Sequence, residues 1–288
     1  MKILAVNSSA RTGRGSKTEL LLDHLVEGMR EAGAEVEVVN LRHKKVKNCL
    51  GCFTCWTKTP GVCVHKDDMT EELFPKFIAS DLMVLATPLY HYTVNAAMKT
   101  FIERTLPILE PYLRAGDGGR TRHPLRARHP AVAFLSVAGF PENKVFRQLS
   151  SYVNFLYRDT LAAEIYRSAS EVLTQPLFRE KTQSILAAVK EAGRQLAASL
   201  KVSEEVMAWI TQPLFDNFNF MREMANLFWD TCINEGLSPK EFDEKGLTPR
   251  PDSIETFMII MSMGFNPEAA SGTEATLQFV FSGAVGEH

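Results

Sequence analysis

Residues 2–18, KILAVNSSARTGRGSKT, contain a strand-like run, a loop and a helix start in immediate succession. The apolar run at residues 2–7 is typical of a strand buried in a parallel sheet. Residues 8–17 are mostly small, hydroxyl-bearing or basic, and in residues 18–32 the apolar side chains recur at helical spacing. This order predicts the first unit of an α/β protein.

The alternation of strand and helix patterns recurs over residues 1–200. Short apolar runs predict strands at residues 2–7, 35–41, 81–88, 131–139 and 161–167. Helical patterns occupy the intervals, and right-handed crossovers make such strands parallel. We therefore expect an α/β fold with a doubly wound five-stranded parallel sheet in the flavodoxin-like order 2-1-3-4-5. In this topology ligands bind beyond the carboxyl ends of the first and third strands.

The net charge and the lengths of the apolar runs indicate which binding partners to expect. The chain of 288 residues has a formal net charge of −2, which gives no reason to expect a nucleic-acid partner. No apolar run approaches the roughly 20 residues needed to cross a bilayer, and the start lacks a signal-peptide pattern. We expect a cytoplasmic protein without a membrane partner. Because thiols stay reduced there, clustered cysteines point to metal binding or redox chemistry.

The domain organisation follows from the length of the α/β pattern. We expect a first domain at residues 1–200 and a mainly helical extension at residues 201–288, in which residues 203–235 are helical in pattern and rich in aromatic and methionine side chains. Residues 265–287, FNPEAASGTEATLQFVFSGAVGE, resemble the opening of a sterol-carrier-type lipid-binding domain. At most a remnant of such a domain is expected, and we infer no lipid binding from it.

The loop after the first strand has the features of a phosphate-binding turn. Small residues allow backbone N–H groups to approach an anion, and the helix N-terminus adds a positive dipole. The loop hydroxyls can donate hydrogen bonds, and Arg11 and Lys17 add positive charge. The spacing matches neither a Walker A loop nor a full dinucleotide motif. The alternative is an exposed loop whose serine and threonine cap the helix.

The loops after the third and fourth strands are the other candidates. Tyr90, His91 and Tyr92 follow the third strand, where aromatic side chains could pack against a flat ring. The alternative is that the two tyrosines only cover the next helix. Gly139, after the fourth strand, permits a close backbone approach.

Four of the five cysteines lie in residues 48–63, NCLGCFTCWTKTPGVC. Four thiolates suit a [4Fe-4S] cluster, which needs one for each iron, and they also suit tetrahedral zinc. A redox-active or reactive thiol pair is a third interpretation. A fourth is that the cysteines bind no metal and pack beside a ligand pocket. The candidate metal ligands, conditional on a cluster, are Cys49, Cys52, Cys55 and Cys63.

Three stretches together resemble the NADPH-dependent FMN reductase family of the flavodoxin-like fold. They are NSSARTGRGSKTELLL (7–22), ATPLYHYTVNAAMKTFIER (86–104) and CLGCFTCWTKTPGVCVHKDDM (49–69). The last resembles the cysteine-rich loop of a subgroup that includes the iron–sulfur flavoproteins. The phosphate loop departs from the usual Gly-Ser-Pro-Arg and Gly-Asn-Thr, but it keeps small and hydroxyl-bearing residues. The resemblance covers roughly residues 1–200.

The resemblance implies FMN as the cofactor and NAD(P)H as the electron donor. The residues that it implies for the FMN phosphate are Ser9, Arg11, Ser16, Lys17 and Thr18. The residues that it implies for the isoalloxazine ring are Thr87, Pro88, Leu89, Tyr90, His91 and Tyr92, with Ser136 and Gly139 closing a third side. The flavin carries the redox chemistry, so no catalytic side chain is expected. The resemblance also implies a homodimer or homotetramer.

The expected function is that of an FMN-dependent oxidoreductase, which passes electrons from NAD(P)H to a small acceptor such as a flavin or a quinone. A first alternative is an iron–sulfur flavoprotein, in which a [4Fe-4S] cluster takes electrons from ferredoxin and passes them to FMN. A second alternative is a non-catalytic flavin- or lipid-binding module. The sequence does not distinguish NADH from NADPH or identify the acceptor.

Overall fold

The computed structural model describes residues 1–215 and 218–264 and the single positions 272, 274, 276, 278 and 280. The chain divides into two compact units, Met1–Leu214 and Phe215–His288. The first unit ends later than the expected boundary near residue 200, because α6 (Glu204–Thr211) packs on α5 (Arg179–Ser199). The functional division into two domains stays a prediction.

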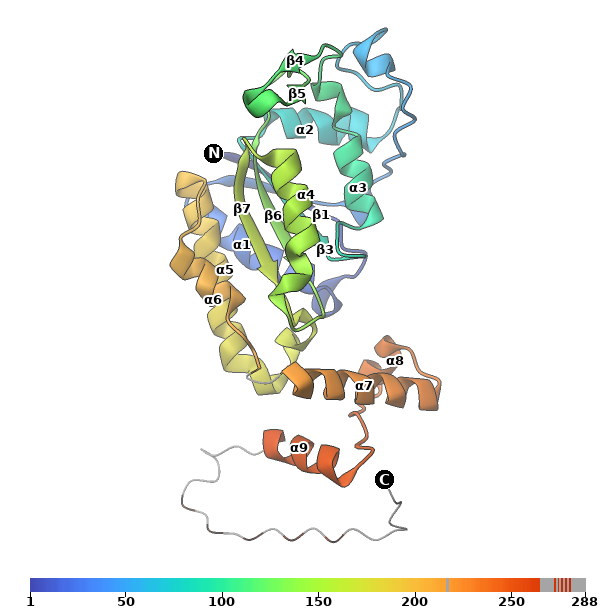
Figure 1. Ribbon diagram of the computed structural model, residues 1–288, viewed down its shortest axis with the longest axis vertical. Helices are drawn as coiled ribbons and strands as arrows, with labels where there is room; N and C mark the ends of the chain where they lie inside the picture. Colours follow the sequence, from blue (N-terminus) through green and yellow to red (C-terminus); the bar gives the residue numbers. More distant parts are fainter. Residues whose placement is uncertain are drawn as a thin grey trace. The chain divides into compact units, whose positions relative to one another are not determined.

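The first unit is built on a parallel sheet with the strand order β2-β1-β3-β6-β7 (Figure 1). Its strands are β1 (Lys2–Asn7), β2 (Glu35–Asn40), β3 (Leu82–Pro88), β6 (Ala131–Val137) and β7 (Leu161–Arg167). Counted along the chain, this order is 2-1-3-4-5, so the predicted flavodoxin-like topology is confirmed. Asn7, at the end of β1, lies opposite Ala86 of β3. The carboxyl ends of the two strands are therefore adjacent.

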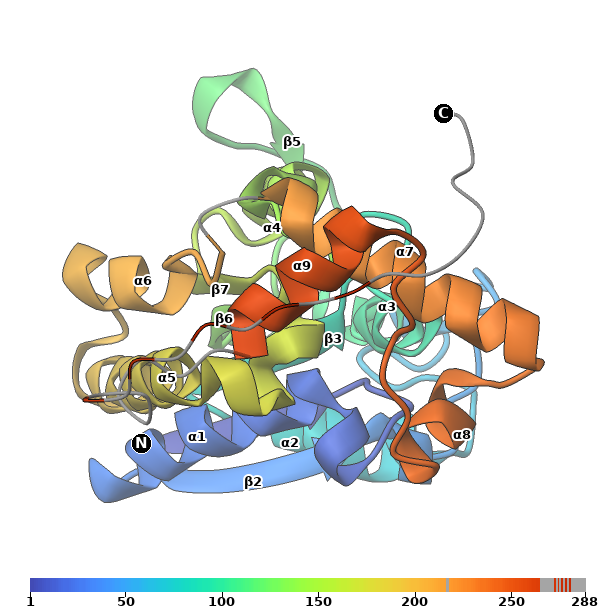
Figure 2. The same cartoon turned by 90° about the horizontal axis from the view of Figure 1, so that it is seen from below.

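Helices cover both faces of the sheet, as the two views in Figures 1 and 2 show. On one face, α1 (Lys17–Glu31) packs along α5. The two helices cross so closely that a Cβ atom added at Gly28 or Gly193 would overlap the backbone of the other helix. The helices of the opposite face are α2 (Phe74–Ala79), α3 (Ala96–Glu103) and α4 (Arg147–Tyr157).

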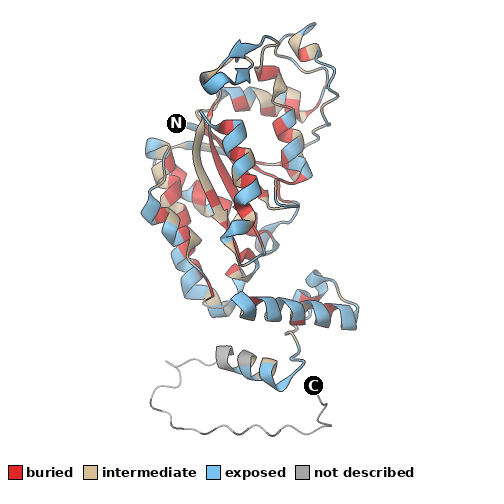
Figure 3. Ribbon diagram, viewed as in Figure 1, coloured by how far each residue is buried: buried red, intermediate tan, exposed pale blue. Residues whose placement is uncertain are grey.

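Alternate residues of the central strands form the core beneath α2, α3 and α4, because successive side chains of a strand point to opposite faces. From β1, β3 and β6 these residues are Leu4, Val6, Met83, Leu85, Val132 and Phe134, and Val39 of β2 joins them. Figure 3 shows buried strands between helices whose outer faces are exposed. The polar residues at the ends of these strands therefore extend from a rigid, apolar core.

A small antiparallel ladder lies outside the main sheet, between β4 (Arg114–Ala115) and β5 (Thr121–Arg122). The helices of the second unit are α7 (Phe218–Glu235), α8 (Pro239–Glu244) and α9 (Ile254–Gly264). The stretch at residues 203–235, expected to be helical, contains the two helices α6 and α7. The segment that resembles a sterol-carrier domain lies almost entirely outside the described residues. None of the helices in the described ranges is both long and apolar enough to cross a membrane.

Candidate functional site

Four chain segments at the carboxyl ends of the strands line one pocket. They follow β1, β3, β6 and β7, as the flavodoxin-like topology predicts for a ligand site. The lining residues are Ser9, Arg11, Gly15, Ser16, Lys17, Thr18, Pro88, Leu89, Tyr90, Val137, Ala138, Gly139, Ser170 and Glu171. The structure thus brings the predicted phosphate loop together with part of the predicted ring-binding loop.

The remaining candidates lie beside this pocket rather than along its lining. Thr87 and Ser136 are fully buried and pair across the β3–β6 ladder. The Ser136 hydroxyl has no hydrogen-bond partner among the described residues. Because an orphaned buried hydroxyl costs free energy, it is a donor that a ligand could satisfy. His91 and Tyr92 are exposed at the tip of the loop after β3.

The phosphate loop is held in a compact form by its own side chains. The Ser16 hydroxyl donates to the Ser9 hydroxyl at 2.9 Å and accepts a hydrogen bond from the Glu19 backbone N–H, which caps α1. The Asn7 side chain accepts from the Ser9 N–H at 2.9 Å. Lys17 is buried, with 8% of its surface exposed, in the first turn of α1. A buried cation, hydroxyls and a helix N-terminus together fit a phosphate group.

Arg42, from the turn after β2, braces the same loop and was not identified from the sequence. Its guanidinium donates to the carbonyl oxygen of Arg11 at 3.3 Å and to that of Ser9 at 3.5 Å. It also pairs with Glu19 at 2.9 Å, and the second oxygen of that carboxylate accepts from the Gly13 N–H. Arg42 therefore ties two carbonyl groups of the loop to the turn after β2.

Asn95 joins the loops after β1 and β3. Its side chain caps α3 by accepting from the Met98 N–H at 3.0 Å, and it donates to the Ser8 carbonyl at 2.7 Å. Its backbone N–H donates to the Thr87 hydroxyl at 3.3 Å. One buried residue thus fixes the distance between the predicted phosphate loop and the predicted ring-binding loop.

The loop after β3 ends in a strained two-residue turn. Tyr90 and Thr93 exchange both backbone hydrogen bonds at 3.0 Å, with His91 and Tyr92 between them. Both central residues have positive φ, 46° and 64°, as a type I′ turn requires. Asn-Gly is favoured in such a turn, so two bulky residues there cost free energy. In this turn the Tyr92 ring lies nearly parallel to that of Phe140, at an interplanar angle of 13° and with 6.2 Å between the centroids.

Glu171 is an acidic residue among the basic ones of the pocket, and the sequence did not indicate it. Its carboxylate lies 3.2 Å from the Arg11 guanidinium and 4.0 Å from the Lys17 ammonium. It reaches the pocket from the segment after β7, about 160 positions along the chain from the phosphate loop.

The four cysteines of the 48–63 loop differ in their surroundings. Cys55 is buried and Cys52 is exposed, whereas Cys49 and Cys63 are intermediate. Burial raises the pKa of the Cys55 thiol, and the other three cysteines, of which Cys63 acts most strongly, raise it further. Hydrogen bonding from Thr54 lowers the pKa of Cys52. The thiols of this loop therefore differ in both exposure and acidity.

As a set of donors, four thiols in one loop suit an iron–sulfur cluster. Within the described ranges, no three side chains of His, Cys, Asp or Glu are placed to hold one metal ion. That result concerns a single ion such as zinc, because a cubane cluster binds each thiolate through a different iron. The assignment of the four cysteines as ligands stays a prediction.

A buried ion pair attaches the cysteine loop to the end of α3. Arg104 donates to both oxygens of Asp67, at 2.7 and 3.0 Å, and to the Lys47 carbonyl at 2.6 Å. Burial raises the pKa of Asp67, but the hydrogen bonds from Arg104 and from the backbone of Lys47 and Thr70 outweigh it, so the pKa lies far below its usual range. Asp67 also accepts from the Thr70 N–H at the start of the next helical segment.

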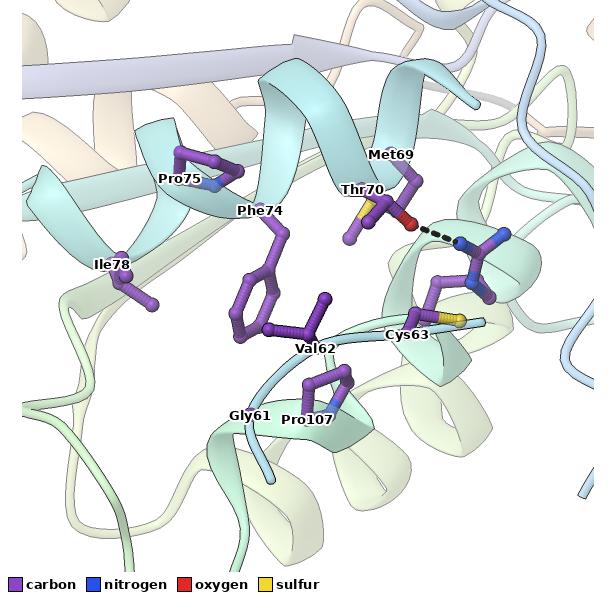
Figure 4. Close-up of a pocket in the computed structure, with 10 residues that line it drawn as sticks. Gly61, Val62, Cys63, Met69, Thr70, Phe74, Pro75, Ile78 and Pro107 are labelled. Carbon is purple, nitrogen blue, oxygen red and sulfur yellow. Dashed lines mark hydrogen bonds between the residues drawn. The ribbon is translucent and has the colours of Figure 1, made fainter. Parts of the chain in front are cut away.

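An apolar cavity of about 220 Å³ adjoins this ion pair (Figure 4). Val62, Phe74 and Ile78 form part of its wall, and Cys63 lies at the end where Thr70 bonds to the guanidinium of Arg104. The cavity is separate from the pocket at the strand ends, since the two share no lining residue.

Comparisons with known proteins identify relatives of this chain. The family described as NADPH-dependent FMN reductase matches residues 1–150. An iron–sulfur flavoprotein of Archaeoglobus fulgidus is 41% identical over 121 residues, which cover 41% of this chain and 52% of that protein. FMN-dependent NADH:quinone oxidoreductase 2 of Pseudomonas aeruginosa is 28% identical over 111 residues, which cover 36% of this chain and 54% of that protein. The chain therefore spans about half the length of the curated relatives it matches.

Among solved structures, an FMN-dependent NADH-azoreductase from Bacillus anthracis, in complex with FMN, superimposes with a TM-score of 0.51. The alignment covers 68% of this chain and 99% of that protein, at 16% sequence identity. At this identity the likeness shows a shared fold.

Proposed function

This chain belongs to the NADPH-dependent FMN reductase family, and we propose that it is an FMN-dependent oxidoreductase that passes electrons from NAD(P)H to a small acceptor such as a flavin or a quinone. The observation that carries the proposal is the single pocket formed by the segments after β1, β3, β6 and β7. Its chemistry, a basic hydroxyl-rich loop opposite Tyr90, suits a phosphate at one end and a flat ring at the other.

The phosphate of FMN would be held by the loop at the start of α1. The proposed ligands are Ser9, Arg11, Ser16, Lys17 and Thr18. Lys17 supports this assignment most strongly, because its buried charge lines the pocket in the first turn of a 15-residue helix. Ser9 and Ser16 already bond to each other, so their hydroxyls are oriented before the ligand arrives.

The isoalloxazine ring would lie against the loop after β3 and the end of β6. The proposed contacts are Thr87, Pro88, Leu89, Tyr90, His91, Tyr92, Ser136 and Gly139. The bound flavin would supply the capacity to accept a hydride and to release electrons singly or in pairs. The role of the protein would be to orient the ring with the rigid Asn95-linked loops and to exclude water with Tyr90 and Leu89.

Flavin content and reduction by a nicotinamide test the proposal. We expect the purified full chain to bind FMN and its visible spectrum to bleach when NADPH or NADH is added without oxygen. Lys17→Met should lower FMN occupancy, whereas Lys201→Met, the same change at an exposed lysine outside the pocket, should not. A chain that takes up no FMN after reconstitution contradicts the proposal. FMN binding without nicotinamide oxidation would instead support a flavin-binding module.

A second candidate function rests on the cysteine loop. Cys49, Cys52, Cys55 and Cys63 would hold a [4Fe-4S] cluster that receives electrons from ferredoxin, as in an iron–sulfur flavoprotein. The presence of four cysteines within residues 48–63 supports it. Iron and sulfide assays on anaerobically purified protein separate the two functions. About four irons per chain favour the cluster, whereas a pure flavin spectrum without iron favours the plain reductase.

The state of assembly is also a proposal. We expect a homodimer or homotetramer, which light scattering of the purified chain will measure. A monomer at micromolar concentration contradicts it.

A further inference from the structure

Glu171 places a carboxylate where the proposed phosphate site holds its cations. One carboxylate oxygen, Oε1, lies 3.2 Å from Arg11 Nη1, and the other, Oε2, lies 4.0 Å from Lys17 Nζ. The side chain passes over Gly139, since a Cβ atom added there would lie 3.5 Å from Glu171 Cγ. Each oxygen therefore faces a different cation of the predicted cradle.

The backbone holds Glu171 in this position. The preceding residues bond to the segment after β6: the Ala169 N–H donates to the Phe140 carbonyl at 2.6 Å, and the Ser170 N–H to the Ala138 carbonyl at 2.9 Å. Ala169 has a φ of 50°, a left-handed conformation that non-glycine residues seldom adopt. Ser170 is almost completely buried. These hydrogen bonds fix the segment after β7 and therefore the backbone position of Glu171.

A phosphate monoester carries a charge between −1 and −2 near neutral pH and seeks the same donors as a carboxylate. The two anions cannot share Arg11 and Lys17 without repulsion. The side chain of Lys17 is only 9% exposed, whereas those of Glu171 and Arg11 are about half exposed. Solvent therefore screens the charge of Lys17 less than it screens the charges of Glu171 and Arg11. When a phosphate binds, the Glu171 carboxylate must either give up its contacts with Arg11 and Lys17 or remain next to a second anion.

We propose that Glu171 is an internal counter-anion of the phosphate site, which competes with the phosphate of FMN and so limits the preference of the protein for FMN over riboflavin. This inference rests on the proposed flavin function. It makes Glu171 a specificity-determining residue that acts on the phosphate end of the ligand. The ring-binding loop is not involved.

The test measures the dissociation constants of FMN and riboflavin for the full chain, after bound flavin has been removed, by quenching of flavin fluorescence. We expect Glu171→Gln to tighten FMN binding by about threefold to tenfold and to leave riboflavin binding unchanged. Glu180→Gln is the matched control, because it makes the same change of charge at an exposed residue outside the pocket. It should alter neither constant by more than about twofold.

The outcomes separate this inference from the proposed function. If the wild-type chain binds neither flavin, the proposed function fails. If the wild type binds both, but Glu171→Gln leaves the ratio of the two constants unchanged or weakens FMN selectively, the competition is contradicted. In the latter case Glu171 would orient Arg11 and Lys17 for the phosphate. Melting temperatures of the variants show whether any change in binding reflects loss of folded protein.

Discussion

Arg104 and Asp67 form a two-point ion pair in the interior, with 1% and 2% of their side chains exposed. Arg104 ends α3, which follows the ring-binding loop, and Asp67 follows the cysteine loop. The pair therefore joins the base of the cysteine loop to the element that positions the proposed flavin site.

Asp67→Asn should lower the free energy of unfolding by about 3–5 kcal/mol, because it leaves the Arg104 charge buried without its counter-ion. Urea unfolding monitored by circular dichroism measures the change. Asp68→Asn is the control, since the adjacent carboxylate accepts from the Lys45 N–H and carries no comparably buried partner. Equal losses in the two variants would show that the buried pair is not the source of the stability.

The same pair predicts how stability depends on pH. The pKa of Asp67 in the folded protein lies below that of an unfolded aspartate, about 3.9. Its contribution is therefore complete above about pH 5 and is lost progressively as the pH falls through the unfolded pKa toward the lower folded one. Between pH 5 and pH 3, the unfolding free energy of the wild type should fall more steeply than that of Asp67→Asn. Parallel curves would contradict the assignment.

Replacing His91 and Tyr92 by Asn and Gly should stabilise the protein by about 1–2 kcal/mol, because both new residues tolerate the positive φ of a type I′ turn. The same change should weaken flavin or acceptor binding. It removes the Tyr92 ring, which stacks on Phe140 and is one of the proposed contacts of the isoalloxazine. Tyr92→Ala separates the effects: it removes the ring and keeps the strain. Thermal unfolding and flavin titration are the measurements. A double variant no more stable than the wild type would show that the turn is unstrained.

Arg42→Met should weaken FMN binding by about tenfold, because the loop carbonyls of Ser9 and Arg11 lose their common donor. Lys44→Met removes a cation from the neighbouring turn, where it pairs with Glu72, and should leave binding unchanged. Flavin titration compares the two. Similar affinities for both variants would mean that the loop keeps its form without Arg42.

The thiols of the cysteine loop should react in a definite order with iodoacetamide in protein free of iron. Cys52 is exposed and has a lowered pKa, whereas Cys55 is buried and has a raised one, so Cys52 should react at least about tenfold faster near pH 8. Peptide mapping by mass spectrometry measures the rates. Faster modification of Cys55 would show that the loop opens in solution.

The parts of the fold and the site that could be predicted are those that the sequence encodes locally. Apolar runs alternating with helical periods yield the sheet order, because few topologies satisfy right-handed crossovers. The basic, small-residue loop before α1 is also a local pattern. Arg11 and Lys17 belong to that loop and both line the pocket at the strand ends, while their assignment to a phosphate stays a prediction.

The residues that escaped prediction come from distant segments or carry no local signal. Glu171 meets the phosphate loop only through the pairing of β6 with β7, and Arg42 only through the pairing of β1 with β2. The type I′ turn was not predicted because His91 and Tyr92 lack the Asn or Gly that marks such turns. The ion pair of Asp67 with Arg104 has no local signal either, since the two residues lie 37 positions apart along the chain.

Helix α3 acts as a spacer of fixed length. Asn95, before its first residue, is bonded to the loop after β1, and Arg104, after its last, is bonded to Lys47 and Asp67, which flank the cysteine loop. At 1.5 Å per residue, the two anchors stand roughly 13 Å apart along the axis. One residue inserted into α3 would turn Arg104 by about 100° away from Asp67. The loops on either side of α3 can vary in length, but the number of residues between Asn95 and Arg104 cannot change without breaking one of the two attachments.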